Sequence, residues 1–466
     1  MYPDLGPVFY LDVWPFSNPV LVITSASFGR QLTDAQLHKD KSFCDFMDAF
    51  TEKMDLVCME GQDWKKWKAV FSPGFQSSHI MDLVPNIIQD IELFRTKLRA
   101  QSETGKVFSL EDMSTKLTVD VIGRVALNVS LDTQRRPHEL ASALVSQINW
   151  NVDQNQFNPL VLLNPFRPFV LRYNTYRMNR YLDDRLKLLG KSKETKLEKG
   201  RSIIELALHS YQATNASKGD SSTGIGAGAD STFLRVARSQ VKLFLFAGHD
   251  TTAGTICYAI YLLSKNTTAL SKLRQEHDEV LDHPENTPAQ FSENPHLVNR
   301  LPYTAAVIKE ALRLYPPASL IRAGRPDFQL RDPTNNTAYP TQGVMVWSVH
   351  RSIQRDPSCW KRAAEFIPER WLVAKDDPLF PPIENFRAFE RGPRSCIGQE
   401  IANTEMKLTL ALTAREFNFT SVYKELDQGK KGIWTVNGEL AYQVPKGSAH
   451  PRDGMPMRVK FRSKQV

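Results

Sequence analysis

Residues 389–398 read Phe-Glu-Arg-Gly-Pro-Arg-Ser-Cys-Ile-Gly, and the interpretation of the whole chain starts from them. Cys396 lies between two glycines, directly before a helix expected over about 398–415. A thiolate beside a helix N-terminus has a lowered pKa, because the backbone dipoles favour the anion. A soft thiolate is also a strong axial ligand for haem iron. The segment predicts a metal-ligating sulfur, against the alternative of a structural cysteine buried beside a turn.

The neighbours of this cysteine suit a flat, anionic macrocycle. Gly392 and Gly398 let the backbone turn tightly and approach such a group. Arg394 can pair with a haem propionate, and Phe389 can shield the sulfur from water. These residues are therefore candidates for cofactor binding, with Cys396 as the ligand to the metal.

Residues 247–252 read Ala-Gly-His-Asp-Thr-Thr within a long expected helix. Ala247 and Thr251 share a helix face, and Gly248 removes a side chain where a ligand could approach. Thr251 can distort the helix by bonding back to a carbonyl, and Asp250 beside it is a proton source. Because cleavage of dioxygen consumes two protons, an acid next to an alcohol suits that reaction. The alternative is a polar break in a core helix.

Two further places carry groups that suit a propionate. Trp64 and Lys68 are four residues apart, so one helix face presents an indole N–H and a cation. Arg322 follows a Tyr-Pro-Pro turn, and Arg325 is its rival because the register is open there.

Some charged residues of these helices are expected to have other roles. Lys65 and Lys66 fall on other faces of the Trp64 helix and are free to meet a partner. His249 is expected to be structural, since it lies about 200° around its helix from Ala247.

Composition excludes several classes of protein. The 466 residues are 24% charged and 41% hydrophobic, an ordinary globular balance. The five cysteines do not fit a disulfide framework or a zinc site, and no C-x-x-C-H motif attaches a c-type haem. The net charge of +8 comes from scattered Lys and Arg, which indicates solvated faces and not a nucleic-acid site. No apolar run reaches the roughly 18 residues that span a bilayer, so the chain is expected to be soluble or peripheral.

Apolar spacing predicts a mainly α protein with a small β portion. One domain is expected over 1–466, with a flexible loop at 214–231. An irregular stretch is expected over 355–395, and β-hairpins after Phe417. The expected strands are 7–13, 19–24, 319–330 and 342–348. The expected helices are 26–38, 62–72, 77–101, 110–128, 136–151, 174–195, 201–213, 232–264, 268–281, 302–315 and 398–415.

The cysteine segment resembles the signature of the cytochrome P450 family, F-x-x-G-x-R-x-C-x-G, at all five fixed positions. Residues 247–252 match the family's A-G-x-[DE]-T-T motif. Glu310 and Arg313 match its E-x-x-R, and Arg370 in Phe-Ile-Pro-Glu-Arg-Trp would complete a buried Glu-Arg-Arg network. The family usually has W-x-x-x-R where this chain has Lys68, which keeps the charge and loses the bidentate fork. The resemblance covers nearly the whole chain.

This resemblance implies the cytochrome P450 fold and one non-covalent haem b, iron protoporphyrin IX. It implies a monooxygenase that inserts one oxygen atom of O2 into an apolar organic substrate, with electrons from NADPH through NADPH–cytochrome P450 reductase. Thr251 and Asp250 would serve oxygen activation and proton delivery, and Cys396 would be the proximal ligand. The cofactor-binding residues would be Cys396, Arg394, Trp64, Lys68, Arg322, Phe389 and Gly398.

The chain is most similar in texture to fungal microsomal members that serve secondary metabolism. Such members begin with a membrane-anchor helix; none is expected in this sequence, either because the anchor was lost or because the sequence begins late. The resemblance implies the cytosolic face of the endoplasmic reticulum membrane with peripheral membrane contact, or the cytosol. Substrate contacts are expected at 40–61, 149–165, before Ala247 and at 318–321. Phe43, Phe46 and Phe50 are interpreted as a core stripe, with a pocket as the alternative.

Two other functions stay open on the same scaffold. One is a haem-thiolate isomerase or dehydratase, although such members typically lose the acid–alcohol pair that Asp250 and Thr251 form. The other is a non-enzymatic haem-binding sensor, which would need neither residue.

Overall fold

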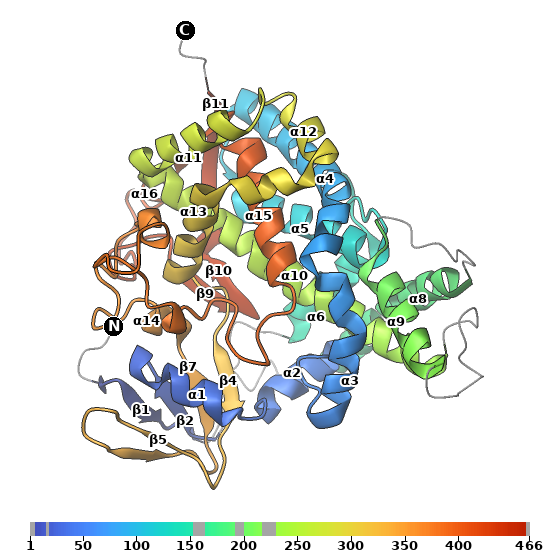
Figure 1. The fold of residues 1–466 in the computed structure, drawn as a ribbon, viewed down its shortest axis with the longest axis vertical. Coiled ribbons are helices and arrows are strands. Elements are labelled where there is room, and N and C mark those ends of the chain that lie inside the picture. Colours follow the sequence, from blue (N-terminus) through green and yellow to red (C-terminus); the bar gives the residue numbers. More distant parts are fainter. Residues whose placement is uncertain (1–4, 15–17, 152–163, 192–199, 217–229, 463–466) are drawn as a thin grey trace.

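The computed structural model describes residues 5–14, 18–151, 164–191, 200–216 and 230–462. The mainly α fold with a small β portion is confirmed. Its centre is the 35-residue helix α10 (Ser231–Lys265), which packs against α5 (Leu110–Leu127) and α15 (Gln399–Thr413) (Figure 1). Helix α10 is buried on nearly all sides, as expected for a helix that is apolar around its circumference.

Most expected helices are present. Where their observed bounds differ from the expected ones, the cause is local. The helix expected at 26–38 begins with the 3-10 helix η2 (Ala26–Phe28) and continues as α1, which ends early because Gln36 takes a left-handed conformation with φ 46°. Helix α2 was not expected; Asp40 caps it by accepting a hydrogen bond from the Ser42 N–H. The helix expected from 174 begins at Arg167 instead. The remaining helices are α1 (Gly29–Ala35), α2 (Lys41–Thr51), α3 (Gly61–Phe71), α4 (Ser77–Thr104), α6 (Glu139–Asn151), α8 (Arg167–Lys191), α9 (Ile203–Ala216), α11 (Thr267–Val280), α12 (Thr287–Glu293), α13 (Pro302–Leu314), α14 (His350–Ile353) and α16 (Tyr423–Leu426).

The largest described sheet has the strand order β1-β2-β7-β4, formed by β1 (Val8–Leu11), β2 (Val20–Ile23), β7 (Met345–Ser348) and β4 (Leu320–Ala323). The strand expected at 319–330 is wrong as one element, because it divides into β4 and β5 (Gln329–Arg331), which pairs with β6 (Ala338–Pro340). The tail is only partly hairpin.

In that tail, β9 (Gln443–Lys446) and β10 (Ser448–Pro451) form a hairpin. By contrast, β8 (Phe417–Ser421) and β3 (Phe108–Ser109) both pair with β11 (Pro456–Phe461). The final sheet therefore joins distant parts of the chain, a pairing that local turn signals do not predict.

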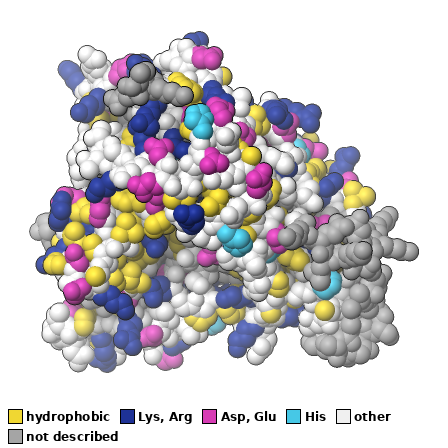
Figure 2. Space-filling model, turned by 45° about the horizontal axis from the view of Figure 1, so that its top comes forward, with side chains coloured by type: hydrophobic (Ala, Val, Ile, Leu, Met, Phe, Trp, Pro, Cys, Tyr) yellow, Lys and Arg dark blue, Asp and Glu magenta, His cyan; other side chains and the backbone are white. Residues whose placement is uncertain are grey.

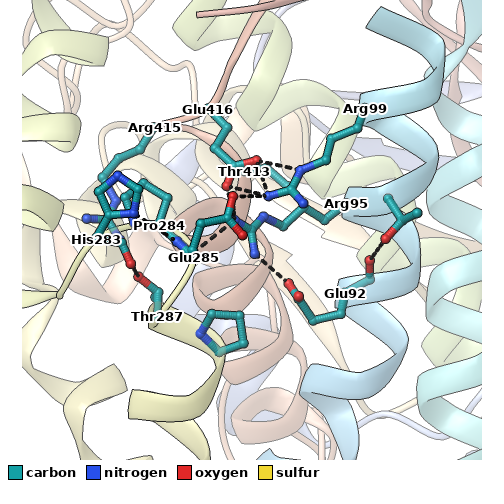
Figure 3. Close-up of polar contacts among 12 residues, drawn as sticks. Glu92, Arg95, Arg99, His283, Pro284, Glu285, Thr287, Thr413, Arg415 and Glu416 are labelled. Atoms are coloured by element: carbon teal, nitrogen blue, oxygen red, sulfur yellow. Dashed lines mark hydrogen bonds and ion pairs between the residues drawn. The ribbon is translucent and has the colours of Figure 1, made fainter. Parts of the chain in front are cut away.

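A buried polar network ties α4 to the end of α15 (Figure 3). Arg95 is 1% exposed and pairs with Glu416, while its Nη2 also donates to the Pro284 carbonyl at 2.9 Å. Arg99 Nη2 lies 3.1 Å from a Glu416 oxygen and 2.8 Å from one of Glu285. The charges satisfy one another, so this network is a structural brace behind α15.

Charged side chains are distributed as the sequence predicted. On the face drawn in Figure 2, basic and acidic groups are interspersed, with apolar areas between them. Among the described residues, no helix has both the length and the apolarity needed to cross a bilayer.

Candidate active site

Cys396 lies in a tight loop just ahead of α15. Its N–H donates to the Phe389 carbonyl at 2.8 Å, and Ser395 N–H donates to the Gly392 carbonyl at 3.0 Å. Gly392 has φ 79°, so the turn favours glycine. The same argument is wrong for Gly398, whose φ of −83° suits any residue. Gly398 instead directs its N–H at the sulfur.

The sulfur is accessible although protein surrounds it. Cys396 is exposed to solvent, yet burial by surrounding protein raises the pKa of its thiol, and the Gly398 N–H only partly offsets this. The expectation of a lowered pKa is therefore wrong for the protein alone, because desolvation of the anion outweighs the helix dipole. A bound metal ion reverses that balance, since a coordinating thiol loses its proton. An accessible sulfur within enclosing protein is what an axial ligand requires.

A buried carboxylate that sequence reasoning missed holds the cysteine loop. Glu390 has φ 56° and pairs with Arg387, and it lies 3.1 Å from His350 Nε2. Arg387 also donates to the Gly29 carbonyl at 3.0 Å and to Thr33 Oγ1 at 2.9 Å. Burial raises the pKa of Glu390, but contacts with His350 and Arg387 outweigh burial and lower this pKa to about 2. The loop is thus anchored to α1 by permanent charges.

The residues predicted at the propionates come together on one side of this loop. The Arg394 guanidinium lies 4.1 Å from the Trp64 ring centre, and Lys68 Nζ lies 4.7 Å from it. Lys68 Nζ donates to the Pro393 carbonyl at 2.6 Å, and Arg394 pairs with Glu60. No described residue accepts a hydrogen bond from the Trp64 indole N–H. Trp64 and Lys68 therefore lie on one face of α3, as their spacing predicted, while the contact of Lys68 with a propionate stays a prediction.

The structure favours Arg322 over its rival Arg325. Arg325 already forms an ion pair with Asp327, with 2.6 Å between Arg325 Nε and Asp327 Oδ1. Arg322 is 7% exposed, and among the described residues no carboxylate pairs with it. Lys39, which bridges to Arg322 through the backbone, also has no carboxylate partner for its side chain among the described residues; its Nζ lies 5.7 Å from the centre of the Phe43 ring. Sequence reasoning missed Lys39, which has no motif around it.

This cluster of cations fits a dianionic cofactor. Burial and then the neighbouring charges of Arg322 and Arg394 lower the pKa of Lys39 to about 8. Burial also lowers the pKa values of Arg322, Arg394 and Lys68. A buried cation with no carboxylate partner, such as Arg322, is costly, so the arrangement gains stability from added negative charge. Two propionates would supply that charge, and the donor set of one thiol and several cations suits haem.

Thr251 and Asp250 are neighbours in α10 with different partners. Thr251 Oγ1 donates to the Ala247 carbonyl at 2.8 Å, the back-bond that the sequence predicted. Asp250 lies 3.1 Å from His450 Nε2. Ala247 is exposed in the middle of a buried helix, so this face of α10 borders a hollow.

Two other residues of the motif serve packing. A Cβ on Gly248 would meet Ile122 at 3.2 Å, so this glycine lets α5 approach α10 and does not make room for a ligand. The expectation for Gly248 was wrong. His249 is 3% exposed and bonds the Leu245 carbonyl at 2.6 Å, in keeping with its expected structural role.

The Glu-Arg-Arg network forms as expected. Both Glu310 oxygens accept from Arg313, at 2.9 and 2.8 Å, and Arg370 Nε donates at 3.0 Å. The Trp371 indole and the Ile367 N–H complete the set at 3.0 Å each. All three charged side chains are at most 1% exposed. The network ties α13 to the segment before the cysteine loop.

Aromatic side chains from α2 approach the middle of α10 at Phe246, next to Ala247. Phe50 is fully buried, as a core residue should be, and its ring lies 5.2 Å from that of Phe246. Phe46 lies 5.9 Å from Phe246, and Phe43 and Phe46 are only partly buried. Phe50 is therefore a core residue, whereas Phe43 and Phe46 are available to a ligand. Of the expected substrate regions, 152–163 lies outside the described residues.

Comparisons with known proteins agree with this geometry. The family described as Cytochrome P450 matches residues 3–441. The chain is 41% identical to cytochrome P450 monooxygenase polC of Polytolypa hystricis, over 99% of this chain and 82% of the relative. It is 29% identical to cytochrome P450 monooxygenase acrF of Aspergillus aculeatus, over 98% and 94%. It is 27% identical to cytochrome P450 3A15 of Cavia porcellus, over 79% and 70%.

Proposed function

This chain belongs to the cytochrome P450 family, and we propose that it holds haem b, iron protoporphyrin IX, with Cys396 as the axial ligand. The observation that carries this proposal is the accessible sulfur of Cys396, enclosed by protein and accompanied by Arg322, a buried cation with which no described carboxylate pairs. Arg322, Arg394 and Lys39 would meet the propionates, with Lys68 and Trp64 beside them. Phe389 and Gly398 would flank the sulfur.

The chain acts as a monooxygenase. Overall, RH, O2, NADPH and a proton give ROH, water and NADP+. The haem supplies dioxygen binding and the oxidising power for oxygen transfer. In this proposal the chain holds the thiolate, excludes bulk water and moves protons from Asp250 towards the Thr251 hydroxyl. One catalytic domain is proposed over 1–466. The loop expected at 214–231 is shorter, because residues 214–216 end α9 and Ser231 begins α10, and residues 217–229 lie outside the described part.

Loss of the Thr251 hydroxyl is expected to uncouple the enzyme. Thr251→Ala should oxidise NADPH within a few-fold of the parent while releasing mostly hydrogen peroxide, because O2 then takes up two electrons and two protons without bond cleavage. Asp250→Asn should slow the whole cycle, since the proton donor itself is lost. NADPH, peroxide and product are measured together in one assay. Parent-like coupling in Thr251→Ala would contradict the role of the hydroxyl.

We propose that electrons come from an NADPH–cytochrome P450 reductase that docks beside α3. Lys65 and Lys66 are exposed there, and opposite charge on a partner would steer association. Lys65→Glu with Lys66→Glu should slow association at least several-fold and flatten its dependence on salt. Stopped-flow reduction of the haem measures this rate.

The matched control reverses Lys424 and Lys460, which are exposed on α16 and β11 at the opposite end of the molecule (Figure 1). That variant should associate like the parent. Hydrogen peroxide supplied as oxidant bypasses the reductase, so turnover driven by it should survive both reversals. Equal losses with reductase and with peroxide would count against docking and indicate misfolding.

The substrate is proposed to be an apolar organic molecule of fungal secondary metabolism, since the relatives polC and acrF are fungal monooxygenases. The cytosolic face of the endoplasmic reticulum membrane is the proposed location. Phe166, Phe169, Tyr173 and Tyr176 fall on one face at the start of α8 and are each at least 59% exposed. We propose that they contact the membrane peripherally, which flotation with lipid vesicles tests.

A further inference from the structure

Three charged side chains form a chain beside α10. His450, on β10, lies between Asp250 and Glu111, which is in the first turn of α5. Its Nδ1 is 2.6 Å from a Glu111 oxygen, and its Nε2 is 3.1 Å from an Asp250 oxygen. Both ring nitrogens therefore face carboxylates, and only the imidazolium can donate to both.

The surroundings keep this histidine charged. Its side chain is 16% exposed and that of Asp250 is 9% exposed, so solvent screens their attraction weakly. Burial lowers the pKa of His450, but contacts with Asp250 and Glu111 outweigh burial and raise this pKa to about 10. Burial raises the pKa of Asp250, but His450 and then His249 lower it, and the net result is a pKa below the usual value. The carboxylate of Asp250 is thus ionised and fixed in direction.

A hollow of about 790 Å³ reaches the same groups from outside. Glu111, Asp250 and His450 line it, together with parts of α6 and the segment before it. Arg135 and Arg136 also line it and are exposed, so the hollow opens to solvent. Water in the hollow can therefore reach Asp250 and exchange protons with it.

We propose that this hollow is the proton entry port of the enzyme, and that His450 is a positioning residue that holds Asp250 at its inner end. The inference rests on the proposed monooxygenase function, because it names the source of the protons that Asp250 and Thr251 deliver. A hydronium ion in the hollow gives a proton to an Asp250 oxygen and becomes water, and the proton moves on towards Thr251. Asp250 is then ionised again, so each passage transfers one proton with no other change.

The other groups around His450 do not take the place of its ring between Asp250 and Glu111. Thr118 Oγ1 donates to the His249 carbonyl at 2.7 Å, which fixes α10 against α5 at this point. Asp112, also in the first turn of α5, pairs with Lys116 at 2.7 Å and, within the described part of the chain, makes no hydrogen bond or ion pair with His450. The titratable or charged groups that border the hollow are Glu111, Asp112, Lys116, Arg135, Arg136, His138, His249, Asp250, Lys446 and His450.

The first arm of the test reads the charge of His450 directly. In the diamagnetic ferrous carbon monoxide complex, the His450 ring resonance is assigned by its loss in His450→Gln. It should stay in the protonated position up to at least about pH 8, given the pKa of about 10. Glu111→Gln should move the titration down towards the ordinary value of about 6.5. A parent resonance that titrates near pH 6.5 would overturn the bridging charge.

The second arm measures the share of consumed O2 that is released as hydrogen peroxide with reductase and NADPH. His450→Gln should raise this share at least three-fold and shift the acid limb of coupling to higher pH, because Asp250 loses its cation. His450→Arg restores a cation between the carboxylates and should recover most of the coupling. Asp112→Asn, the matched control, should behave as the parent.

The two proposals fail in different ways. If His450→Gln matched Asp112→Asn while Thr251→Ala still released peroxide, the port would be overturned and the monooxygenase function would stand. If the parent formed no thiolate complex and oxidised no NADPH, the proposed function would be overturned, and the entry port with it.

Discussion

Cys396→Ser is expected to abolish the red-shifted absorption band of the reduced, carbon monoxide-bound protein. That band reports a thiolate opposite carbon monoxide, and a hydroxyl is a far weaker and harder donor. The loss should be complete, because the sulfur is the proposed bond between protein and iron. The absorption difference spectrum measures it without any knowledge of the substrate.

The other four cysteines supply the controls. Cys44, Cys58 and Cys359 are partly buried and Cys257 is fully buried, and none of the four lies in the loop before α15. Replacing each of the first three by serine, or Cys257 by alanine, should leave the band in place. Circular dichroism should show that Cys396→Ser keeps its helices. A thiolate band in Cys396→Ser would refute the assignment of the ligand.

Glu310→Ala is expected to be the most destabilising change outside the haem site. It would leave the guanidinium groups of Arg313 and Arg370 uncompensated at 0% and 1% exposure. Removing one partner of a buried ion pair costs about 3–5 kcal/mol, a large part of the stability of a typical domain. The variant should therefore unfold at a much lower temperature and incorporate little haem during expression.

The control for this change is Glu365→Ala on the same side of the fold. Glu365 and Arg362 pair at 2.5 Å, but both side chains are more than half exposed. A surface pair contributes about 0–1 kcal/mol, so this variant should unfold near the parent temperature. Glu310→Gln, which keeps the shape and some hydrogen bonds, should fall between them. A Glu310→Ala protein as stable as the Glu365→Ala protein would contradict the structural role of the network.

Short motifs with strong local geometry were predictable from the sequence. The turn at Gly392, the back-bond of Thr251 and the helix face of Lys68 all depend on neighbours within four residues, or on contacts that the motif itself implies. The Glu310 network could be predicted because its members match a known pattern. The core helix α10 followed from its length and apolar content.

Contacts between distant segments were not predictable. His450 and Asp250 are 200 residues apart and carry no shared signal. Lys39 meets Arg322 only because a backbone bridge joins their segments. Gly248 was misread because the sequence shows a missing side chain but not the Ile122 that fills the space. The thiol pKa was misjudged for a similar reason, since burial is a property of the folded chain.

The most direct test of the central claim is incorporation of labelled oxygen. Apolar fungal metabolites are first screened for a substrate that shifts the haem spin state, and turnover then runs under 18O2 with reductase and NADPH. The account predicts a product that carries one 18O atom, with about one NADPH consumed for each product in the coupled parent. A product that formed without NADPH, or that carried no 18O, would contradict the monooxygenase and indicate an isomerase or dehydratase.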